Sequence, residues 1–372
     1  MLNTNTPALR ILGTRGLPAA HGGFETFAEH LALYLVDRGW KVTVYCQVTG
    51  DGSITEDEWK GVRRVNIAVP DRGKATSMHF DWLAVRHAAA AGEPCLTLGY
   101  NTAIFCAWLR LKRIPNVINM DGIEWHRAKW GKLAKTWFWI NEWAGCWLGD
   151  HLVADHPDIK RHLESRANPA KITVIPYGAD EVAAASAAVE PLAALGLTSG
   201  NFVSVIARAE PENSLLEIVQ GFSRKPRGCK LVVLGSYDRK MHYQRSVLEA
   251  ASEEVVFPGA IYDKSVVSSL RSHSKAYVHG HQVGGTNPSL VEALGAGNAV
   301  IAHDNRFNRW VIGPQAAYFR DGDSFAAQID LLLAEPQRLE AMRVASRARY
   351  LEAFRWDTIL GAYERLLVQY QR

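Results

Sequence analysis

Six consecutive residues at 284–289 combine backbone freedom with helix capping, a combination that can bind an anion. They are Gly284, Gly285, Thr286, Asn287, Pro288 and Ser289. The apolar-periodic segment that follows predicts a short helix, which Asn287 or Ser289 can cap with Pro288 in its first turn. The unpaired backbone N–H groups at such a helix start favour a phosphate.

Glu292 lies one turn into this predicted helix, close to whatever the loop holds. A phosphate repels a carboxylate, so Glu292 is better suited to accept hydrogen bonds from sugar hydroxyls. A capped surface helix with a solvated Glu292 explains the same spacing equally well.

A second loop follows the first predicted strand of the chain. Gly22 and Gly23 precede a predicted helix at 24–35, where glycine allows a ligand to approach the backbone and the helix start attracts phosphate. Thr14 and Arg15 stand at the end of the strand and can contribute to the same site. An ordinary tight turn is an equal alternative.

Arg208 follows a predicted strand at 202–206, and its guanidinium can bind a diphosphate through two hydrogen bonds. His279 and His281 flank Gly280 after another predicted strand, but no third residue has the spacing of a metal ligand. We therefore expect no metal site.

A third group follows the predicted strand at 116–120 and contains Asp121, Gly122, Glu124 and His126. Carboxylates at the carboxyl end of a strand can hold sugar hydroxyls or act as a general base. A capped helix with solvated charges is the alternative.

The elements that carry these loops alternate between strand and helix along the whole chain. Predicted strands cover 10–13, 42–45, 94–98, 116–120, 151–154 and 172–175, then 202–206, 230–234, 255–257, 276–278 and 300–302. Helical periodicity lies between several of them, at 103–111 and 215–222 for example. This order predicts an α/β fold with two Rossmann-like, doubly wound parallel sheets, whose strand ends face each other across a cleft.

Composition excludes several other classes. The 372 residues are 48% apolar with a net charge of +4, which fits two folded domains and excludes global disorder. The chain contains no run of five or more Lys or Arg residues, so its charge does not suggest a nucleic-acid partner. The five cysteines lack zinc spacing, and no signal-peptide pattern or 18-residue apolar stretch is present, so we expect a cytoplasmic protein.

The segment 125–147 is rich in tryptophan, with lysines between the aromatic residues. The tryptophans are Trp125, Trp130, Trp137, Trp139, Trp143 and Trp147. On one helix, Trp139, Trp143 and Trp147 would share a face, with Trp130 and Trp137 roughly opposite. We expect one face to lie in the core; the other fits either the core or a membrane or lipid contact.

Four motifs in chain order resemble the retaining GT-B glycosyltransferases of family GT4, in particular their rhamnosyltransferase-like branch. They are GTRGLPAAHGGFETF at 13–27, NMDGIEW at 119–125, RAEPEN at 208–213 and GGTNPSLVEALGAGNAVIAHDN at 284–305. Together the motifs cover nearly the whole chain, which makes the resemblance more specific than any one of them.

The resemblance implies three parts: an acceptor domain at 1–178, a nucleotide-sugar domain at 179–355, and a final helix at 356–372 that crosses back to the first domain. It implies transfer of a sugar, rhamnose or another hexose, from a nucleoside-diphosphate sugar to a glycan or lipid-linked glycan with retention of configuration, in cell-surface polysaccharide biosynthesis. It implies no cofactor and, together with the tryptophan segment, a peripheral contact with the inner membrane face.

The resemblance also assigns roles to residues of this chain. The catalytic residues would be Asp121, Arg208 and Glu292. The donor-binding residues would be Gly22, Gly23, Arg208, Asn213, Gly284, Gly285, Thr286, Asn287, Pro288, Ser289 and Glu292. The acceptor-binding residues would be Thr14, Arg15, Glu25, Gly122, Glu124 and His126.

Two positions depart from the family pattern. Asn213 stands where many relatives carry a lysine, and Gly284 stands where they carry the first of two glutamates. These departures leave open a nucleotide-sugar- or glycan-binding protein whose active site has decayed. An NAD-dependent oxidoreductase is a weaker alternative, because the loop after the first strand lacks the G-x-G-x-x-G pattern.

Overall fold

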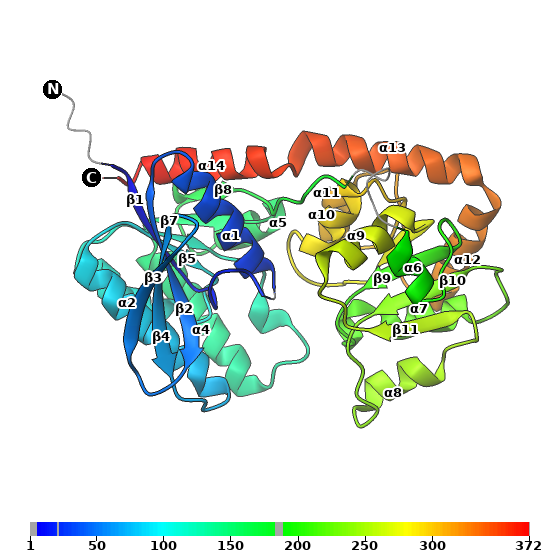
Figure 1. Ribbon diagram of the computed structural model, residues 1–372, viewed down its shortest axis with the longest axis horizontal. Helices are drawn as coiled ribbons and strands as arrows, with labels where there is room; N and C mark the ends of the chain where they lie inside the picture. The colour runs from blue at the N-terminus through cyan, green and yellow to red at the C-terminus, as the bar shows by residue number, and fades with distance from the viewer. Residues whose placement is uncertain (1–5, 21, 183–188, 372) are drawn as a thin grey trace. The chain divides into compact units, whose positions relative to one another are not determined.

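A computed structural model describes residues 6–20, 22–182 and 189–371. The chain forms two compact units (Figure 1). Unit 1 comprises Met1–Pro176 and Trp356–Arg372, and unit 2 comprises Tyr177–Arg355. The change of unit thus comes two residues before the expected boundary at 178/179. The expected junction at 165–200 contains residues 183–188, which lie outside the described residues, as do 1–5 of the N-terminal segment.

Unit 1 contains an eight-stranded sheet with the order β3-β4-β2-β1-β5-β6-β7-β8. The strands are β1 (Ala8–Leu12), β2 (Lys41–Thr49), β3 (Ile54–Trp59), β4 (Val62–Val69), β5 (Cys95–Leu98), β6 (Asn116–Asn119), β7 (His151–Ala154) and β8 (Ile172–Val174). All neighbours pair in parallel except β3 and β4, which pair antiparallel.

The strands β3 and β4 were not predicted from the sequence. Five of the six residues of β3 are exposed, so the strand lacks the apolar alternation that signals a half-buried strand. It is an edge strand held by charge: Arg63 pairs with Glu56, and Arg64 pairs with Asp57 at 2.6 Å. Charged side chains are a common protection for an exposed sheet edge.

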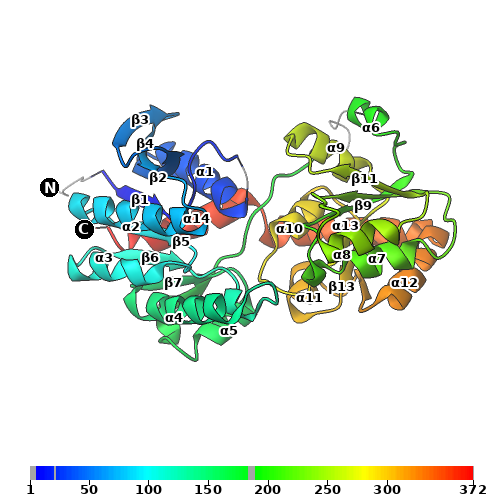
Figure 2. The same ribbon diagram turned by 90° about the horizontal axis from the view of Figure 1, so that it is seen from below.

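Helices cover both faces of the unit 1 sheet. They are α1 (Gly23–Val36), α2 (Lys74–Ala91), α3 (Ala107–Leu111), α4 (Lys132–Leu148), α5 (Pro157–Leu163) and α14 (Trp356–Val368), with short 3₁₀ turns η1 (Ala103–Cys106), η2 (Glu124–His126) and η3 (Pro169–Lys171). The helices α2, α3 and α4 lie on one face and α1 and α14 on the other (Figure 1, Figure 2).

The C-terminal helix α14 packs into the core of unit 1. The side-chain amide of Asn119, at the end of β6, donates a 2.8 Å hydrogen bond to the hydroxyl of Tyr363. The Tyr363 ring lies 4.7 Å from that of Phe27 on α1. All three side chains are buried, so the last helix completes the packing of the first domain.

Unit 2 contains a six-stranded parallel sheet with the order β11-β10-β9-β12-β13-β14. The strands are β9 (Phe202–Ile206), β10 (Lys230–Leu234), β11 (Val255–Gly259), β12 (Ala276–His279), β13 (Val300–His303) and β14 (Ala317–Phe319). The helices are α6 (Glu190–Ala194), α7 (Leu215–Phe222), α8 (His242–Glu249), α9 (Lys264–His273), α10 (Pro288–Gly295), α11 (Arg306–Ile312), α12 (Gly322–Ala334) and α13 (Pro336–Ala353), with the 3₁₀ turn η5 (Pro211–Asn213).

The described residues form three apolar clusters against this sheet. One joins α7 and α12 to the sheet, the second joins α10 and α13 to it, and a smaller third joins α6 and α9 to it. The predicted strands and helices of this half match the observed ones within two residues at most ends, because buried β-branched runs and helical periodicity are both strong signals. The prediction of an α/β fold with two Rossmann-like parallel-sheet units is therefore confirmed.

The expectation for the tryptophan segment needs correction. Trp125 lies in η2 and Trp130 lies before α4, so neither shares the helix with Trp137. The buried stripe of α4 consists of Asn141, Glu142, Gly145 and Cys146, with no tryptophan. Because glycine, asparagine and paired glutamate can pack closely on the turn η1 and the sheet, the aromatic residues lie at the margins and on the outer side of the helix.

All five cysteines are buried and none forms a disulfide. Burial raises the pKa of the Cys95, Cys106 and Cys146 thiols, which makes them unreactive at neutral pH. Across the described parts of the chain, no helix is both long and apolar enough to cross a membrane.

Candidate functional site

Two loops at the carboxyl ends of neighbouring strands in unit 2 are bound to each other. The Ser214 hydroxyl, after β9, donates to the Gly280 carbonyl, after β12, at 2.8 Å. The Gln282 amide donates to the Glu212 carbonyl at 2.9 Å. A Cβ atom at Gly280 would lie 2.1 Å from the Asn213 carbonyl oxygen, so glycine is required for this close contact. The loops therefore form one rigid platform.

A third loop joins the platform after β13. The side-chain amides of Asn305 and Asn308 donate to the His281 carbonyl at 3.0 and 2.9 Å. Asn305 also caps α11, accepting from the amides of Phe307 and Asn308. Ligands of open α/β sheets bind at this edge, beyond the carboxyl ends of the strands.

The start of α10 stands on this platform with the predicted capping geometry. Asn287 is the N-cap and accepts from the Ser289 amide at 3.0 Å, and Pro288 is the first helical residue. Thr286 is buried, and the other residues of 284–289 are half-buried. Gly284 has a φ of 120° and no atom within 4 Å of a Cβ position, so the space on that side of the backbone is open.

Glu292 forms an ion pair with a residue that the sequence reading missed. Its carboxylate lies 2.5 Å from the Arg271 guanidinium of α9. The Arg271 side chain is 8% exposed and that of Glu292 is 38% exposed. Arg271 thus anchors the carboxylate from beneath, while the other side of Glu292 stays open to solvent.

Arg208 and Asn213 have different environments in the loop after β9. Arg208 is exposed, and no described residue forms an ion pair with its side chain. Asn213 is 2% exposed, and its side-chain amide donates to the Arg208 carbonyl at 2.8 Å. Asn213 therefore shapes the loop, and Arg208 is the group with a charge available for an anion.

Histidines from β12 and β13 meet at the same edge. The rings of His279 and His281 are stacked with centroids 4.3 Å apart. Burial lowers the pKa of His279 well below 6.5 and also lowers the pKa of His303, so both rings are neutral at pH 7. Within the described ranges, no group of three or more His, Cys, Asp or Glu could hold a metal ion.

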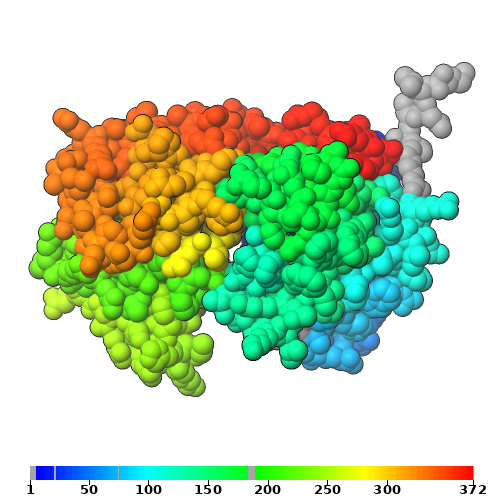
Figure 3. Space-filling model, turned by 180° about the vertical axis from the view of Figure 1, so that it is seen from behind, coloured from blue at the N-terminus to red at the C-terminus, as the bar shows by residue number. Residues whose placement is uncertain are grey.

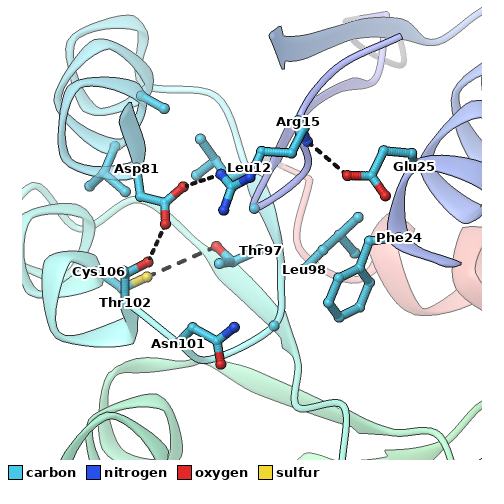
Figure 4. Close-up of a pocket in the computed structure, with 14 residues that line it drawn as sticks. Leu12, Arg15, Phe24, Glu25, Asp81, Thr97, Leu98, Asn101, Thr102 and Cys106 are labelled. Atoms are coloured by element: carbon cyan, nitrogen blue, oxygen red, sulfur yellow. Dashed lines mark hydrogen bonds and ion pairs between the residues drawn. The ribbon is translucent and has the colours of Figure 1, made fainter. Parts of the chain in front are cut away.

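In unit 1, a cavity of about 130 Å³ opens at the carboxyl ends of β1 and β5 (Figure 4). Arg15 and Glu25, two of the predicted acceptor residues, line it. Arg15 lies 3.2 Å from the carboxylate of Asp81 on α2, which also accepts a 2.9 Å hydrogen bond from Thr102. Glu25 accepts from the Arg15 backbone amide at 3.3 Å. The cavity therefore presents charged and hydroxyl groups to a polar ligand.

Asp81 is the most buried charge at this cavity. Burial raises the pKa of the Asp81 carboxyl, while the nearby Arg15 guanidinium and the Thr102 hydroxyl lower it in part. The sequence reading missed Asp81, Asn101 and Thr102, which also line the cavity. The one available signal was an acidic residue inside an apolar helical pattern at 74–91.

The remaining predicted residues of this loop support its shape. Thr14 is buried, and its hydroxyl accepts from the Gly16 amide at 3.4 Å. Gly22 is the N-cap of α1 with a φ of 92°, and Gly23 is the first residue of the helix. Side chains other than glycine rarely adopt this φ, so the turn into α1 depends on Gly22.

Asp121 lies at the end of the next strand, β6, in a strained conformation. Its φ of 49° is unusual for a residue other than glycine. Its backbone amide donates a 2.9 Å hydrogen bond to the side-chain oxygen of Asn119, which stabilises this conformation. Burial raises the pKa of the Asp121 carboxyl to about 6, and the nearby charge of Glu124 adds to the effect. Such strain and a perturbed carboxyl are typical of functional sites.

Glu124 is held from three directions beside Asp121. Its carboxylate accepts from Arg127 at 3.0 Å and from the Trp130 indole at 3.1 Å, and its backbone amide donates to the Tyr100 hydroxyl at 2.7 Å. Gly122 is buried and His126 is exposed, with its ring 4.0 Å from that of Trp125. The structure thus brings Thr14, Arg15, Glu25, Asp121 and Glu124 to the same edge of one sheet.

Two family models match the chain, one in each half. Residues 7–180 match a domain of unknown function (DUF1972), and residues 195–349 match the glycosyl transferases group 1 domain. No curated protein matches the chain.

Solved structures of similar fold cover nearly the whole chain. Sucrose-phosphate synthase from Thermosynechococcus elongatus is 18% identical with a TM-score of 0.80, covering 98% of both chains. Anabaena Alr3699/HepE in complex with UDP-glucose is 12% identical with a TM-score of 0.75, covering 98% of this chain and 99% of that one. An α,α-trehalose-phosphate synthase (UDP-forming) from Burkholderia xenovorans, in complex with glucose-6-phosphate, is 14% identical with a TM-score of 0.73, covering 97% and 99%.

The protein has the GT-B fold, with two Rossmann-like parallel-sheet domains. The domain matched at 195–349 is of the glycosyl transferases group 1, and it contains the platform, α10 and Arg208. Fold and domain together support a glycosyltransferase of the GT-B type.

Asp121 should make the stability of the protein depend on pH. Its pKa in the folded state, about 6, lies above its usual 3.8, so the folded state binds the proton more tightly. This contribution, on the order of 3 kcal/mol, is fully present below about pH 4 and is lost as pH rises through about 6. In Asp121→Asn this loss of stability with rising pH should disappear. Urea unfolding at a series of pH values measures the free energy of unfolding of both proteins. The same dependence of that free energy on pH in wild type and mutant would contradict the prediction. Glu124→Gln should move the transition to lower pH.

Proposed function

We propose that the protein transfers a sugar from a nucleoside-diphosphate sugar to a hydroxyl of a glycan or lipid-linked glycan, with retention of configuration. Rhamnose is the first choice of sugar and another hexose the second, as in the GT4 branch that the motifs resemble. The protein would act in the cytoplasm, in the biosynthesis of a cell-surface polysaccharide. The observation that carries the proposal is the platform of unit 2, which holds Arg208 and the start of α10 at one sheet edge.

In this proposal unit 2 binds the donor. Arg208 and the N–H groups of 284–289 stabilise the negative charge that develops on the departing diphosphate. Glu292, anchored by Arg271, accepts hydrogen bonds from the ribose hydroxyls. Protein cations and a helix N-terminus then do the work of a divalent metal, so no cofactor is required.

Unit 1 binds the acceptor in the same proposal. The cavity beside Arg15, Glu25 and Asp81 offers hydrogen-bond donors and acceptors for sugar hydroxyls. Asp121 is the carboxyl whose pKa, about 6, suits proton exchange with an acceptor hydroxyl near neutral pH. The complexes of similar proteins with UDP-glucose and with glucose-6-phosphate support a nucleotide-sugar donor and a sugar acceptor.

A panel of UDP, GDP and dTDP sugars tests the proposal through thermal unfolding and turnover. A donor at 100 times its dissociation constant should add about 2.7 kcal/mol to the free energy of unfolding. Release of the nucleoside diphosphate in the presence of a glycan acceptor should follow for the same donor. Failure of every donor to stabilise the protein would contradict the proposal. Donor binding without turnover on any acceptor would favour the decayed binding protein instead.

Glu292→Gln should weaken binding of the donor that the panel identifies. Replacing the charged acceptor of the ribose hydroxyls costs about 1.5–3 kcal/mol, which is roughly a 10- to 150-fold rise in the dissociation constant. Glutamine keeps an oxygen for Arg271, so the fold should persist. Titration calorimetry measures the change, with Glu340→Gln on the exposed side of α13 as the matched control. Unchanged donor affinity would remove Glu292 from the donor site.

Gly284→Glu should reduce activity with the native donor. The φ of 120° disfavours any side chain at this position, and the open space around it would admit a carboxylate close to the diphosphate. We expect a lower kcat/KM for the native donor and no gain relative to a common hexose donor. Gly39→Glu, another open position with a positive φ but on unit 1, controls for backbone strain. A rate gain in Gly284→Glu would mark this position as a lost catalytic one.

A further inference from the structure

Large apolar side chains are exposed in one part of unit 1 more than anywhere else in the described chain. Sixteen of them are exposed among the described residues, and seven lie between 104 and 147. These seven are Ile104, Trp108, Leu111, Leu133, Trp139, Ile140 and Trp147. They belong to η1, α3 and α4, and we call them the apolar patch. Figure 3 shows part of this segment, coloured cyan to turquoise, at the surface of unit 1.

The α4 part of the apolar patch forms a continuous outer face. At 100° per residue, Leu133, Trp139, Ile140 and Trp147 fall within an arc of roughly 120° opposite the buried stripe. The rings of Trp139, Trp143 and Trp147 contact each other edge to face, at 6.1 and 5.5 Å. Leu133 is 90% exposed and Trp147 is 66% exposed, so the described residues leave this face largely uncovered.

The exposed charges within the segments that form the apolar patch are all basic. The exposed residues of 103–113 and 132–148 include four basic side chains and no acidic one: Arg110, Lys112, Arg113 and Lys132. The one acidic residue in these segments, Glu142, is 1% exposed and pairs with Arg166 and His162. Asp150, just beyond α4, pairs with Arg110 at 2.7 Å. A partner surface that matches this composition is apolar at its centre and negatively charged around it.

We propose that the apolar patch binds the surface of an anionic lipid bilayer. Tryptophan rings and lysine side chains are the residues that anchor interfacial helices, with the rings at the level of the headgroups and the cations beside lipid phosphates. A second copy of the chain would bring the same basic residues against each other, which opposes self-association. The surface is independent of sugar transfer, because binding to a bilayer requires no donor and no turnover.

Flotation of the full-length protein with vesicles tests the proposal. We expect binding to phosphatidylcholine vesicles that contain phosphatidylglycerol, weaker binding to phosphatidylcholine alone, and release as salt is raised. The double variant Trp139→Ser/Trp147→Ser should lower the partition coefficient by about tenfold or more, since two large apolar groups are removed. Lys112→Gln/Lys132→Gln should lower it by roughly tenfold, and only for the anionic vesicles.

The matched control is Val344→Ser/Leu351→Ser on α13 of unit 2. These side chains are 63% and 44% exposed, close to the 66% of Trp147 and the 44% of Trp139. The control should bind vesicles as the wild type does, and unchanged thermal unfolding should show that each variant is folded. The proposal is overturned if the wild type stays unbound at low salt, or if the control loses binding as much as the tryptophan variant. It is also overturned if the protein is a dimer that the tryptophan variant dissociates, which would assign the patch to a second copy.

Discussion

The close contact between Gly280 and the Asn213 carbonyl is the constraint on which the loop platform of unit 2 depends. Because position 280 has no side chain, the loops after β9 and β12 approach until Ser214 and Gln282 bind across them. These contacts fix the loop that carries Arg208 relative to the loop that leads into α10. A larger residue at 280 would separate Arg208 from the start of α10, the two groups that contact the diphosphate in the proposed function.

Burial controls the chemistry of the other unit. Asp81 on α2 and Asp121 at the end of β6 are carboxyls whose removal from water raises their pKa. Their neighbours differ: Arg15 compensates Asp81, whereas Glu124 adds a second negative charge beside Asp121. Asp81 is thus held by a guanidinium and a hydroxyl, whereas Asp121, with a pKa of about 6, titrates close to neutral pH.

The helix α4 reverses the usual division between polar and apolar faces. Its buried side contains Asn141, whose side chain accepts from the Ile104 amide, and Glu142, which pairs with Arg166 and His162. These polar groups are satisfied, so their burial is tolerated. The aromatic residues are left outside, where their rings contact one another and solvent. This distribution is what gives unit 1 a surface that differs from the rest of the molecule.

The sequence by itself determined the alternation of strands and helices, the loops after β1, β6, β9 and β12, and the Asn287 cap, because each follows from local periodicity or local turn chemistry. It did not determine the edge strand β3, which is charged rather than apolar, or the partners Arg271 and Asp81, which lie 21 and 66 positions from the residues they bind. Nor could it decide which side of α4 is buried, since a pattern shows that a helix has two faces and not which one meets the sheet. Those outcomes depend on packing between distant segments, and only the tertiary structure decided them.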